Sequence, residues 1–230
     1  MPFSPGKQLI LLAVSWVVYG IIHSLLASES VKHLAKRLFP NGFRAYRLVY
    51  NLLAGLLLLV PLGLMARYPG ELLWRWPGGL RWIMDGAAIA ALAGFAFSLR
   101  MYDNAEFLGL RQLSCPPHEA DTTPPMSLSM AHRFVRHPWY FYGLVIIWTR
   151  EMNAALLTSA IIITLYLIIG SRLEERKLVA CYGEAYRDYQ RHVPALIPRP
   201  WRYLSREQAD RILALANPPG ISEPDRSSHQ

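Results

Sequence analysis

The segment that decides the fold begins with Arg136-His137-Pro138-Trp139-Tyr140 and runs through a hydrophobic hairpin to Glu174-Glu175. Two apolar runs, residues 139–149 and 154–170, form the hairpin. Charged groups therefore lie at the ends of two helices that are apolar enough for a membrane. Ionisable residues in such places are costly and are usually functional. We expect chemistry at a membrane surface, on a substrate that is itself apolar or lipid-soluble.

The composition also favours a membrane protein. Of the 230 residues, 53% are hydrophobic and 17% are charged, whereas soluble domains carry about 25% charged residues. The net charge is +8, but the basic residues lie beside apolar runs, so membrane flanking explains them better than nucleic-acid binding. Cys115 and Cys181 lie in polar segments and are too few for a disulfide framework, so we expect free thiols.

Three further apolar runs precede the hairpin, at residues 9–27, 48–66 and 82–99. Each is close to the roughly 20 residues that a membrane-spanning helix needs. The run 139–149 is shorter and reaches only about 16 Å, about half of the hydrocarbon core. No strand pattern is present. The sequence therefore predicts an all-α integral membrane bundle with about five transmembrane helices and a cytoplasmic C-terminal helical segment.

The basic residues predict the orientation of this bundle. With the N-terminus outside, 19 of the 24 Lys and Arg residues fall in the inner segments. The positive-inside rule favours this arrangement, which places the chain after Gly170 in the cytoplasm. We expect a single domain over residues 1–216, with its cofactor-binding part at about 129–198, and a disordered tail at 217–230.

The polar residues of the hairpin each have a structural and a functional interpretation. Pro138 suits the first turn of a helix and biases His137 away from helical geometry. Arg136 and His137 should then project from a turn, either as an interfacial anchor or as part of a site. Glu174 and Glu175 are adjacent carboxylates near an apolar boundary, where repulsion and desolvation are unfavourable. A ligand with hydroxyl groups or positive charge would relieve that cost, whereas helix-surface charge pairing is the structural alternative.

Other polar residues are expected to be structural. Three tyrosines share one helix face, which is typical of packing: Tyr182, Tyr186 and Tyr189. His23 lies within the first apolar run, where a helix–helix hydrogen bond is favoured over a functional role. Asp85 and Asn51 have the same structural interpretation. Cys115 and His118 lack further ligands at metal spacing, so no metal site is predicted.

Four ordered motifs resemble those of one family of integral membrane enzymes: Arg136-His137-Pro138-x-Tyr140, Glu174-Glu175-x-x-Leu178, Gly183-x-x-Tyr186 and Pro194-x-x-x-Pro198. The family is the isoprenylcysteine carboxyl methyltransferase and phospholipid methyltransferase superfamily, and the resemblance covers about residues 129–198. His23-Ser24 and Phe107-x-Gly109-Leu110-Arg111-Gln112 look like its bacterial methanethiol S-methyltransferase branch. The family usually has glycine two residues after the motif tyrosine, where this chain has Tyr142.

The resemblance implies a methyltransferase of the bacterial inner membrane with S-adenosylmethionine as its cofactor. It implies that Arg136 and Glu175 are catalytic. It also implies a set of cofactor-binding residues: Gln112, His137, Pro138, Tyr140, Glu174 and Glu175. The implied acceptor is first a small apolar thiol, and then an isoprenoid carboxylate or a phospholipid amine. The lipid bilayer is the expected partner, and the oligomeric state is not indicated.

The residue types suit this chemistry. A carboxylate suits ribose hydroxyls, and an arginine suits a carboxylate. Alignment of the two reactants can supply up to about 7–11 kcal/mol of the acceleration. Two alternatives have other functions. One is a bundle that binds haem through His23 and His132 or His137. The other is a degenerate family member that assists assembly or transport.

Overall fold

The computed structural model describes residues 4–100, 105, 108–114 and 125–218. The chain forms two compact units. The first comprises Met1–Asp121 and Tyr142–Leu167, and the second comprises Thr122–Phe141 and Ile168–Gln230. The single domain expected over residues 1–216 stays a prediction. Nearly all of the expected tail lies outside the described residues.

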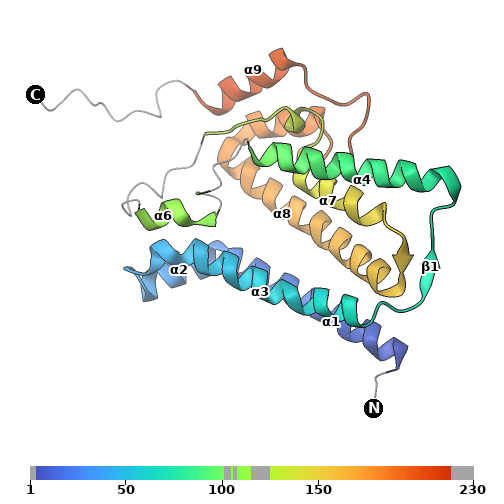
Figure 1. The fold of residues 1–230 in the computed structure, drawn as a ribbon. Coiled ribbons are helices and arrows are strands. Elements are labelled where there is room, and N and C mark those ends of the chain that lie inside the picture. The colour runs from blue at the N-terminus through green and yellow to red at the C-terminus, as the bar shows by residue number, and fades with distance from the viewer. Residues whose placement is uncertain (1–3, 101–104, 106–107, 115–124, 219–230) are drawn as a thin grey trace, which may run out of the picture. The chain divides into compact units, whose positions relative to one another are not determined.

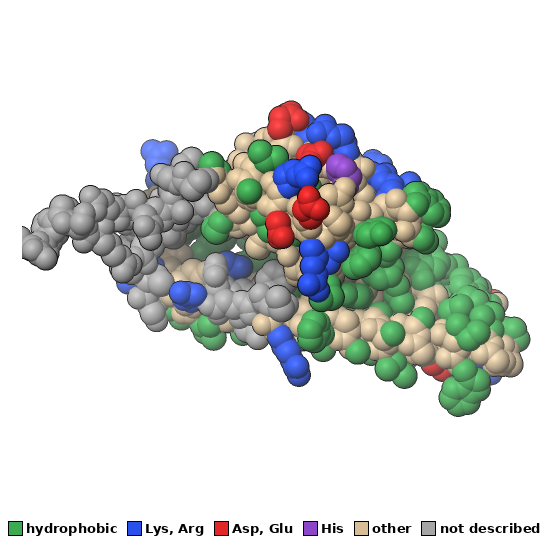
Figure 2. Space-filling model, turned by 90° about the horizontal axis from the view of Figure 1, so that it is seen from above, with side chains coloured by type: hydrophobic (Ala, Val, Ile, Leu, Met, Phe, Trp, Pro, Cys, Tyr) green, Lys and Arg blue, Asp and Glu red, His purple; other side chains and the backbone are tan. Residues whose placement is uncertain are grey.

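The first unit consists mainly of long apolar helices (Figure 1). Those long enough to span a membrane are α1 (Pro5–Ala27), α3 (Tyr46–Arg67), α4 (Gly78–Leu99) and the first part of α8 (Ala154–His192). The apolar helix α7 (Pro138–Trp148) has 11 residues and supplies residues to both units. Many large hydrophobic side chains on these helices are exposed, and Figure 2 shows hydrophobic side chains covering a broad area. Because such a surface suits lipid rather than water, the chain is an integral membrane protein, and the predicted helical bundle is confirmed.

The helix α8 is too long to lie entirely within a membrane. Its 39 residues would extend nearly 60 Å, about twice the thickness of the hydrocarbon core. Residues 154–170 carry no charge, so they form the membrane-spanning part, and the charged part from Ser171 onward lies beyond it. At Gly183 the backbone has φ 56° and ψ −129°, a conformation that glycine adopts readily. The chain therefore changes direction at Gly183 before the helix ends at His192.

Shorter elements complete the first unit. They are α2 (Glu29–Leu38), the 3₁₀ turn η1 (Phe43–Ala45), α6 (Leu110–Ser114), β1 (Leu72–Trp74) and β2 (Met152–Asn153). β1 and β2 pair in antiparallel fashion, so the expectation of no strands is wrong. The reason is their length, since strands of two and three residues leave no alternating pattern in the sequence.

The second unit comprises the 3₁₀ turn η3 (Ala131–Arg133), the charged part of α8 and α9 (Arg206–Ala216), and it contains a small apolar core. The buried core residues are Met126, Tyr186, Tyr189, Val193, Leu204, Ala209 and Ile212. Tyr186 and Tyr189 confirm the predicted packing face, and Tyr182 packs against the core. The Tyr189 hydroxyl donates to the His132 carbonyl at 2.6 Å. The segment before α7 is thereby tied to the end of α8.

Candidate functional site

The candidate site lies in the second unit, where the start of α7 meets the segment after α8. Pro138 is the first residue of α7, as predicted. The residues before it form a bridge to the C-terminal segment: the Arg136 N–H donates to the Pro194 carbonyl at 2.9 Å, and the His137 N–H donates to the Ala195 carbonyl at 3.0 Å. This bridge is possible because the residue before a proline is biased away from helical geometry. It aims both side chains at α8.

Arg136 and Glu175 form a buried, bidentate ion pair. Arg136 Nε lies 2.8 Å from Glu175 Oε1, and Nη2 lies 2.9 Å from Oε2. Their side chains are only 10% and 11% exposed. The remaining terminal nitrogen of Arg136 donates to the carbonyls of Gln190 and Val193. The guanidinium therefore links Glu175 to the end of α8. Most of its N–H groups already have hydrogen-bond partners within the protein.

Glu175 is the centre of this cluster. Besides the two bonds from Arg136, it accepts one from His137 Nε2 at 3.0 Å and one from Gln190 Nε2 at 2.8 Å. Burial alone would raise the pKa of Glu175, but the hydrogen bonds from His137, Arg136 and Gln190 outweigh burial and lower the pKa to about 2. Glu175 is therefore an ionised carboxylate and a poor proton acceptor near neutral pH.

His137 lies between both glutamates. Its Nδ1 is 3.5 Å from Glu174 Oε2, and its ring stacks on Tyr140 with centroids 5.2 Å apart. Burial would lower the pKa of His137, but its hydrogen bonds to Glu174 and Glu175 outweigh burial and raise it. Burial likewise opposes ionisation of Glu174, yet hydrogen bonds from His137 and Tyr140 lower its pKa. The Glu174 side chain is 49% exposed, so its carboxylate is accessible to a ligand.

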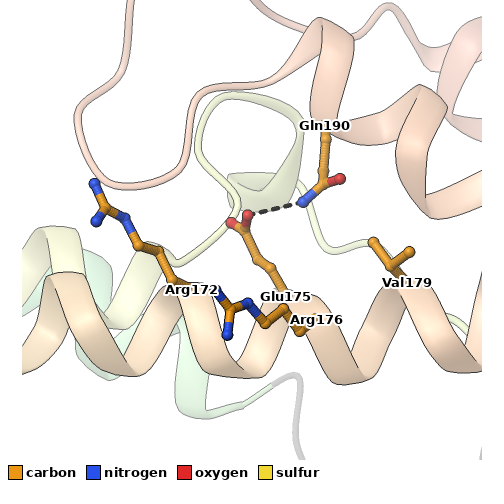
Figure 3. Close-up of a pocket in the computed structure, with 5 residues that line it drawn as sticks. All are labelled: Arg172, Glu175, Arg176, Val179 and Gln190. Atoms are coloured by element: carbon orange, nitrogen blue, oxygen red, sulfur yellow. Dashed lines mark hydrogen bonds between the residues drawn. The ribbon is translucent and has the colours of Figure 1, made fainter.

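A pocket of about 380 Å³ opens beside Glu175 (Figure 3). Its lining residues come from α8 on both sides of the bend at Gly183: Arg172, Glu175, Arg176, Val179 and Gln190. Small-molecule sites typically occupy about 300–1,000 Å³. Within the part of the chain that the structure describes, Arg172 and Arg176 have neither an ion pair nor a hydrogen-bond partner through their side chains. The pocket therefore offers two guanidinium groups to an anion.

Most of the predicted site residues come together in the second unit. Arg136, His137, Tyr140, Glu174 and Glu175 form one connected cluster, and the buried Pro138 supports it by starting α7. Their catalytic and cofactor-binding roles stay predictions.

Gln112 lies on α6 in the first unit, and its cofactor-binding role stays a prediction. Sequence reasoning missed Gln190, Arg172 and Arg176. The arginines have a spacing of four on α8, the signal of a shared helix face. Gln190 approaches Glu175 only because of the bend at Gly183, and no sequence pattern reveals that contact.

The other residues singled out from the sequence are accounted for as follows. Cys181 is an exposed free thiol, as expected, whereas Cys115 and His118 lie outside the described residues. Tyr142, which replaces the glycine of the family, packs its ring against Gly94 of α4. His23 and Asn51 form hydrogen bonds between elements of the first unit, and Asp85 pairs with Arg150.

The chain is similar to several bacterial proteins named methanethiol S-methyltransferase. It is 30% identical over 200 residues to one from Mycobacterium tuberculosis, an alignment covering 86% of this chain and 81% of that protein. It is 29% identical to the Crocosphaera subtropica protein, covering 79% and 71%. It is also 29% identical to methanethiol S-methyltransferase 2 of Bradyrhizobium diazoefficiens, covering 86% and 76%. No protein-family model and no solved structure matches the chain.

Proposed function

The chain belongs to the methanethiol S-methyltransferase family, and we propose on this basis that it transfers a methyl group from S-adenosylmethionine to a small apolar thiol. The observation that carries the proposal is the buried cluster of Arg136, His137 and Glu175 beside a pocket with two available guanidinium groups. The chain is an integral membrane methyltransferase. The donor, the acceptor and the roles of individual residues are proposed.

The side chains around the pocket fit S-adenosylmethionine. Arg172 and Arg176 suit the carboxylate of its methionine part. The accessible Glu174 carboxylate suits its ammonium or its ribose hydroxyls, and Val179 offers an apolar contact to the base. When bound, S-adenosylmethionine supplies an electrophilic methyl group on a positively charged sulfur.

In this proposal Arg136 and Glu175, which the resemblance implies as catalytic, act chiefly by positioning. Each uses its hydrogen bonds on the other and on the end of α8. Together they hold His137, which in turn contacts the exposed Glu174 carboxylate. A cluster with its bonds satisfied is rigid, and rigidity favours methyl transfer because alignment of the reactants is the largest contribution available, up to about 7–11 kcal/mol.

We further propose that the protein lies in the bacterial inner membrane with its N-terminus outside. The basic residues support this orientation, because 19 of the 24 Lys and Arg residues then face the cytoplasm. The second unit would meet S-adenosylmethionine in the cytoplasm, while an apolar thiol would arrive through the lipid. The charged methyl donor and the apolar thiol acceptor would thus reach the enzyme by separate routes.

The proposal is tested by incubating the full-length protein in lipid nanodiscs with methyl-labelled S-adenosylmethionine and candidate acceptors. These are methanethiol, a prenylcysteine and the nanodisc phospholipid. We expect labelled dimethyl sulfide in the headspace and a large loss of it in Glu174→Gln. The matched control is Glu184→Gln, an exposed glutamate on the same helix, which should keep full activity. Label in lipid or prenylcysteine alone would refute a thiol acceptor, and no label in any product would refute methyl transfer.

The haem-binding alternative has less support from the geometry. Both ring nitrogens of His137 lie near glutamate oxygens, and both ring nitrogens of His23 contact tyrosine hydroxyls. An axial ligand needs one nitrogen available to iron. A Soret band in the purified protein, together with no binding of S-adenosylmethionine, would favour that alternative.

A further inference from the structure

The segment between α8 and α9 exposes two aromatic side chains. The Arg202 N–H donates to the Arg199 carbonyl at 3.0 Å, so residues 199–202 form a tight turn with Trp201 near its tip. Trp201 is 77% exposed, and Tyr203 is exposed as well. Tryptophan is on average a highly buried residue, so its place on this turn needs a physical explanation.

The exposure of these rings is fixed by the contacts of their neighbours. Arg202 donates to two backbone carbonyls at the end of α8. Leu204 is fully buried in the apolar core of the second unit. Because alternate residues of an extended chain point to opposite sides, Trp201 and Tyr203 lie together on the outer side. The fold therefore presents both rings to the surroundings.

The two rings adjoin the segment that leads into α7. The Leu204 N–H donates to the Arg133 carbonyl at 2.9 Å, and Arg133 Nε donates to the Leu204 carbonyl at 2.9 Å. Next to this pairing, the exposed Phe134 ring stacks on the Tyr203 ring with centroids 5.9 Å apart. We refer to Phe134, Trp201 and Tyr203 as the aromatic patch. All of it belongs to the second unit.

The aromatic patch lies close to the start of a membrane-embedded helix. Phe134 precedes Pro138, the first residue of the apolar helix α7, by only four residues. Four residues span at most about 14 Å, and the headgroup region on each side of a bilayer is about 5–8 Å thick. The two backbone hydrogen bonds before α7 also hold residues 194–195 at the same helix start. The patch is therefore within reach of the lipid headgroups around α7.

The charge of the two segments suits an anionic surface. Residues 129–139 and 193–206 together contain five arginines and neither Asp nor Glu. Among these arginines, Arg199 and Arg206 are exposed. Arginine beside a bilayer is attracted to anionic lipids, and Trp and Tyr are enriched at the level of the headgroups. There the apolar part of each ring leaves water, while its polar group stays hydrated.

We propose that the aromatic patch docks the second unit on the membrane surface around the start of α7, with anionic phospholipid headgroups as its ligand. Trp201 and Tyr203 insert among the headgroups, and Arg199 pairs with their phosphates. Lipid is favoured over a protein partner because the patch is continuous with a membrane-embedded helix. The patch thus gives the second unit a further attachment to the bilayer besides α7 and α8. This inference does not depend on methyl transfer.

The test compares two fluorescent probes in the full-length protein in lipid nanodiscs. One probe is attached at Ile197→Cys, an exposed position between Ala195 and the turn, with Cys115 and Cys181 changed to serine. The reference probe is attached to the native Cys181 in Cys115→Ser. Cys181 is exposed and lies about 16 Å along α8 beyond Gly170, so we expect it in water. Lipids with a nitroxide near the headgroup should quench the probe at residue 197 severalfold more than the reference, and aqueous iodide should show the reverse.

Substitutions then assign the docking to the patch. Trp201→Ser should reduce lipid quenching of the probe at residue 197 severalfold. Arg199→Gln should reduce it in nanodiscs with phosphatidylglycerol but not in nanodiscs of phosphatidylcholine alone, because only the former offers an anionic surface. Leu215→Ser is the matched control, since it removes an exposed apolar side chain of α9 outside the patch, and it should change nothing.

The outcomes separate the possible occupants of the patch. Equal access of iodide to the two probes would overturn docking altogether. Protection from iodide without quenching by nitroxide lipids would mean that a protein or a second copy of the chain covers the patch, and would overturn the membrane as partner. Equal lipid quenching in the two lipid compositions would overturn the role of anionic headgroups. The comparison of the two probes leaves the patch intact, so it decides the matter even if Trp201→Ser does not fold.

Discussion

His137 and His23 lie in the two units of one chain, in opposite electrostatic surroundings. His137 lies between two carboxylates, one of them also bound to Arg136. His23 lies between two tyrosine hydroxyls. Carboxylates stabilise an imidazolium and raise its pKa, whereas hydroxyl groups satisfy a neutral ring equally well. The partners of a histidine, rather than the residue itself, therefore decide how strongly its ring favours the protonated form.

The largest predicted effect tests the charged cluster of the second unit. Glu175→Gln removes one partner of a buried ion pair and leaves Arg136 without its counter-charge. We expect the free energy of unfolding to fall by about 3–5 kcal/mol and binding of S-adenosylmethionine to be lost. Chemical unfolding in detergent and calorimetry measure the two effects. His137→Ala should also abolish binding.

The control for this substitution is again Glu184→Gln. Glu184 pairs with Arg187 three residues along the same helix, and its side chain is 72% exposed. Its loss should change the free energy of unfolding by at most about 1 kcal/mol. If both variants lost the same stability, or if Glu175→Gln bound S-adenosylmethionine normally, the cluster would not be the site.

The second prediction concerns pH. The pKa of Glu175 is about 2 in the folded protein against an ordinary value of 4.5, so its contribution is complete above pH 4.5 and is lost as the pH falls towards 2. The pKa of His137 is raised above 6.5, so its contribution is complete below pH 6.5 and is lost as the pH rises through the folded value. The loss of stability in acid should be on the order of 3 kcal/mol.

The free energy of unfolding, measured across this pH range, checks both the loss at low pH and the loss at high pH. Glu175→Gln should remove most of the loss at low pH, because an amide does not titrate. A loss of the same size at low pH in that variant would contradict the prediction. The ring nitrogens of His23 contact the hydroxyls of Tyr50 and Tyr166 rather than a carboxylate, so His23→Gln should leave the loss of stability in acid unchanged.

The sequence predicted the features that depend on neighbouring residues. Apolar runs predicted the long helices, and Pro138 predicted the start of α7, because length, hydropathy and proline geometry are local properties. The ordered motifs predicted that Arg136 and Glu175 belong to one site. They did not reveal that the two pair with each other, since both were expected to face a ligand or the reaction.

The remaining features depend on contacts between distant segments. Gln190 reaches Glu175 because the backbone reverses at Gly183, a consequence of one unusual φ value. The tyrosine partners of His23 come from α3 and α8, and no sequence pattern near His23 predicts them. A helix–helix hydrogen bond was nevertheless the favoured interpretation of His23, and the structure confirms it.

The third prediction uses Gly183, which shapes only the second unit. Gly183→Ala should cost about 1–3 kcal/mol, because alanine is strained at this positive φ. An added Cβ meets no atom within 4 Å there, so the cost reports the backbone and not a clash. By displacing Gln190, the substitution should also weaken binding of S-adenosylmethionine.

Gly170→Ala is the matched control, since Gly170 lies in the regular part of α8 with equally open surroundings. This substitution should be neutral or stabilising by up to about 1 kcal/mol. Equal effects of the two substitutions would contradict this account.

The smallest predicted effect sets the ion pair of the first unit against that of the second. Asp85 lies 3.1 Å from Arg150, but the two side chains are 36% and 39% exposed, over three times the exposure of the Arg136–Glu175 pair. Water and headgroups screen such a pair, so Asp85→Asn should cost only about 0.2–1 kcal/mol. It should leave kcat/KM for methanethiol unchanged, because the charged partners of Asp85 are Arg150 and Arg81 rather than residues proposed to act in methyl transfer. Unfolding and methyl-transfer assays of Asp85→Asn, run alongside those of Glu175→Gln, measure the contrast between the two ion pairs. A loss of several kcal/mol would mean that the first unit also depends on an ion pair shielded from water, and the contrast between the two pairs would fail.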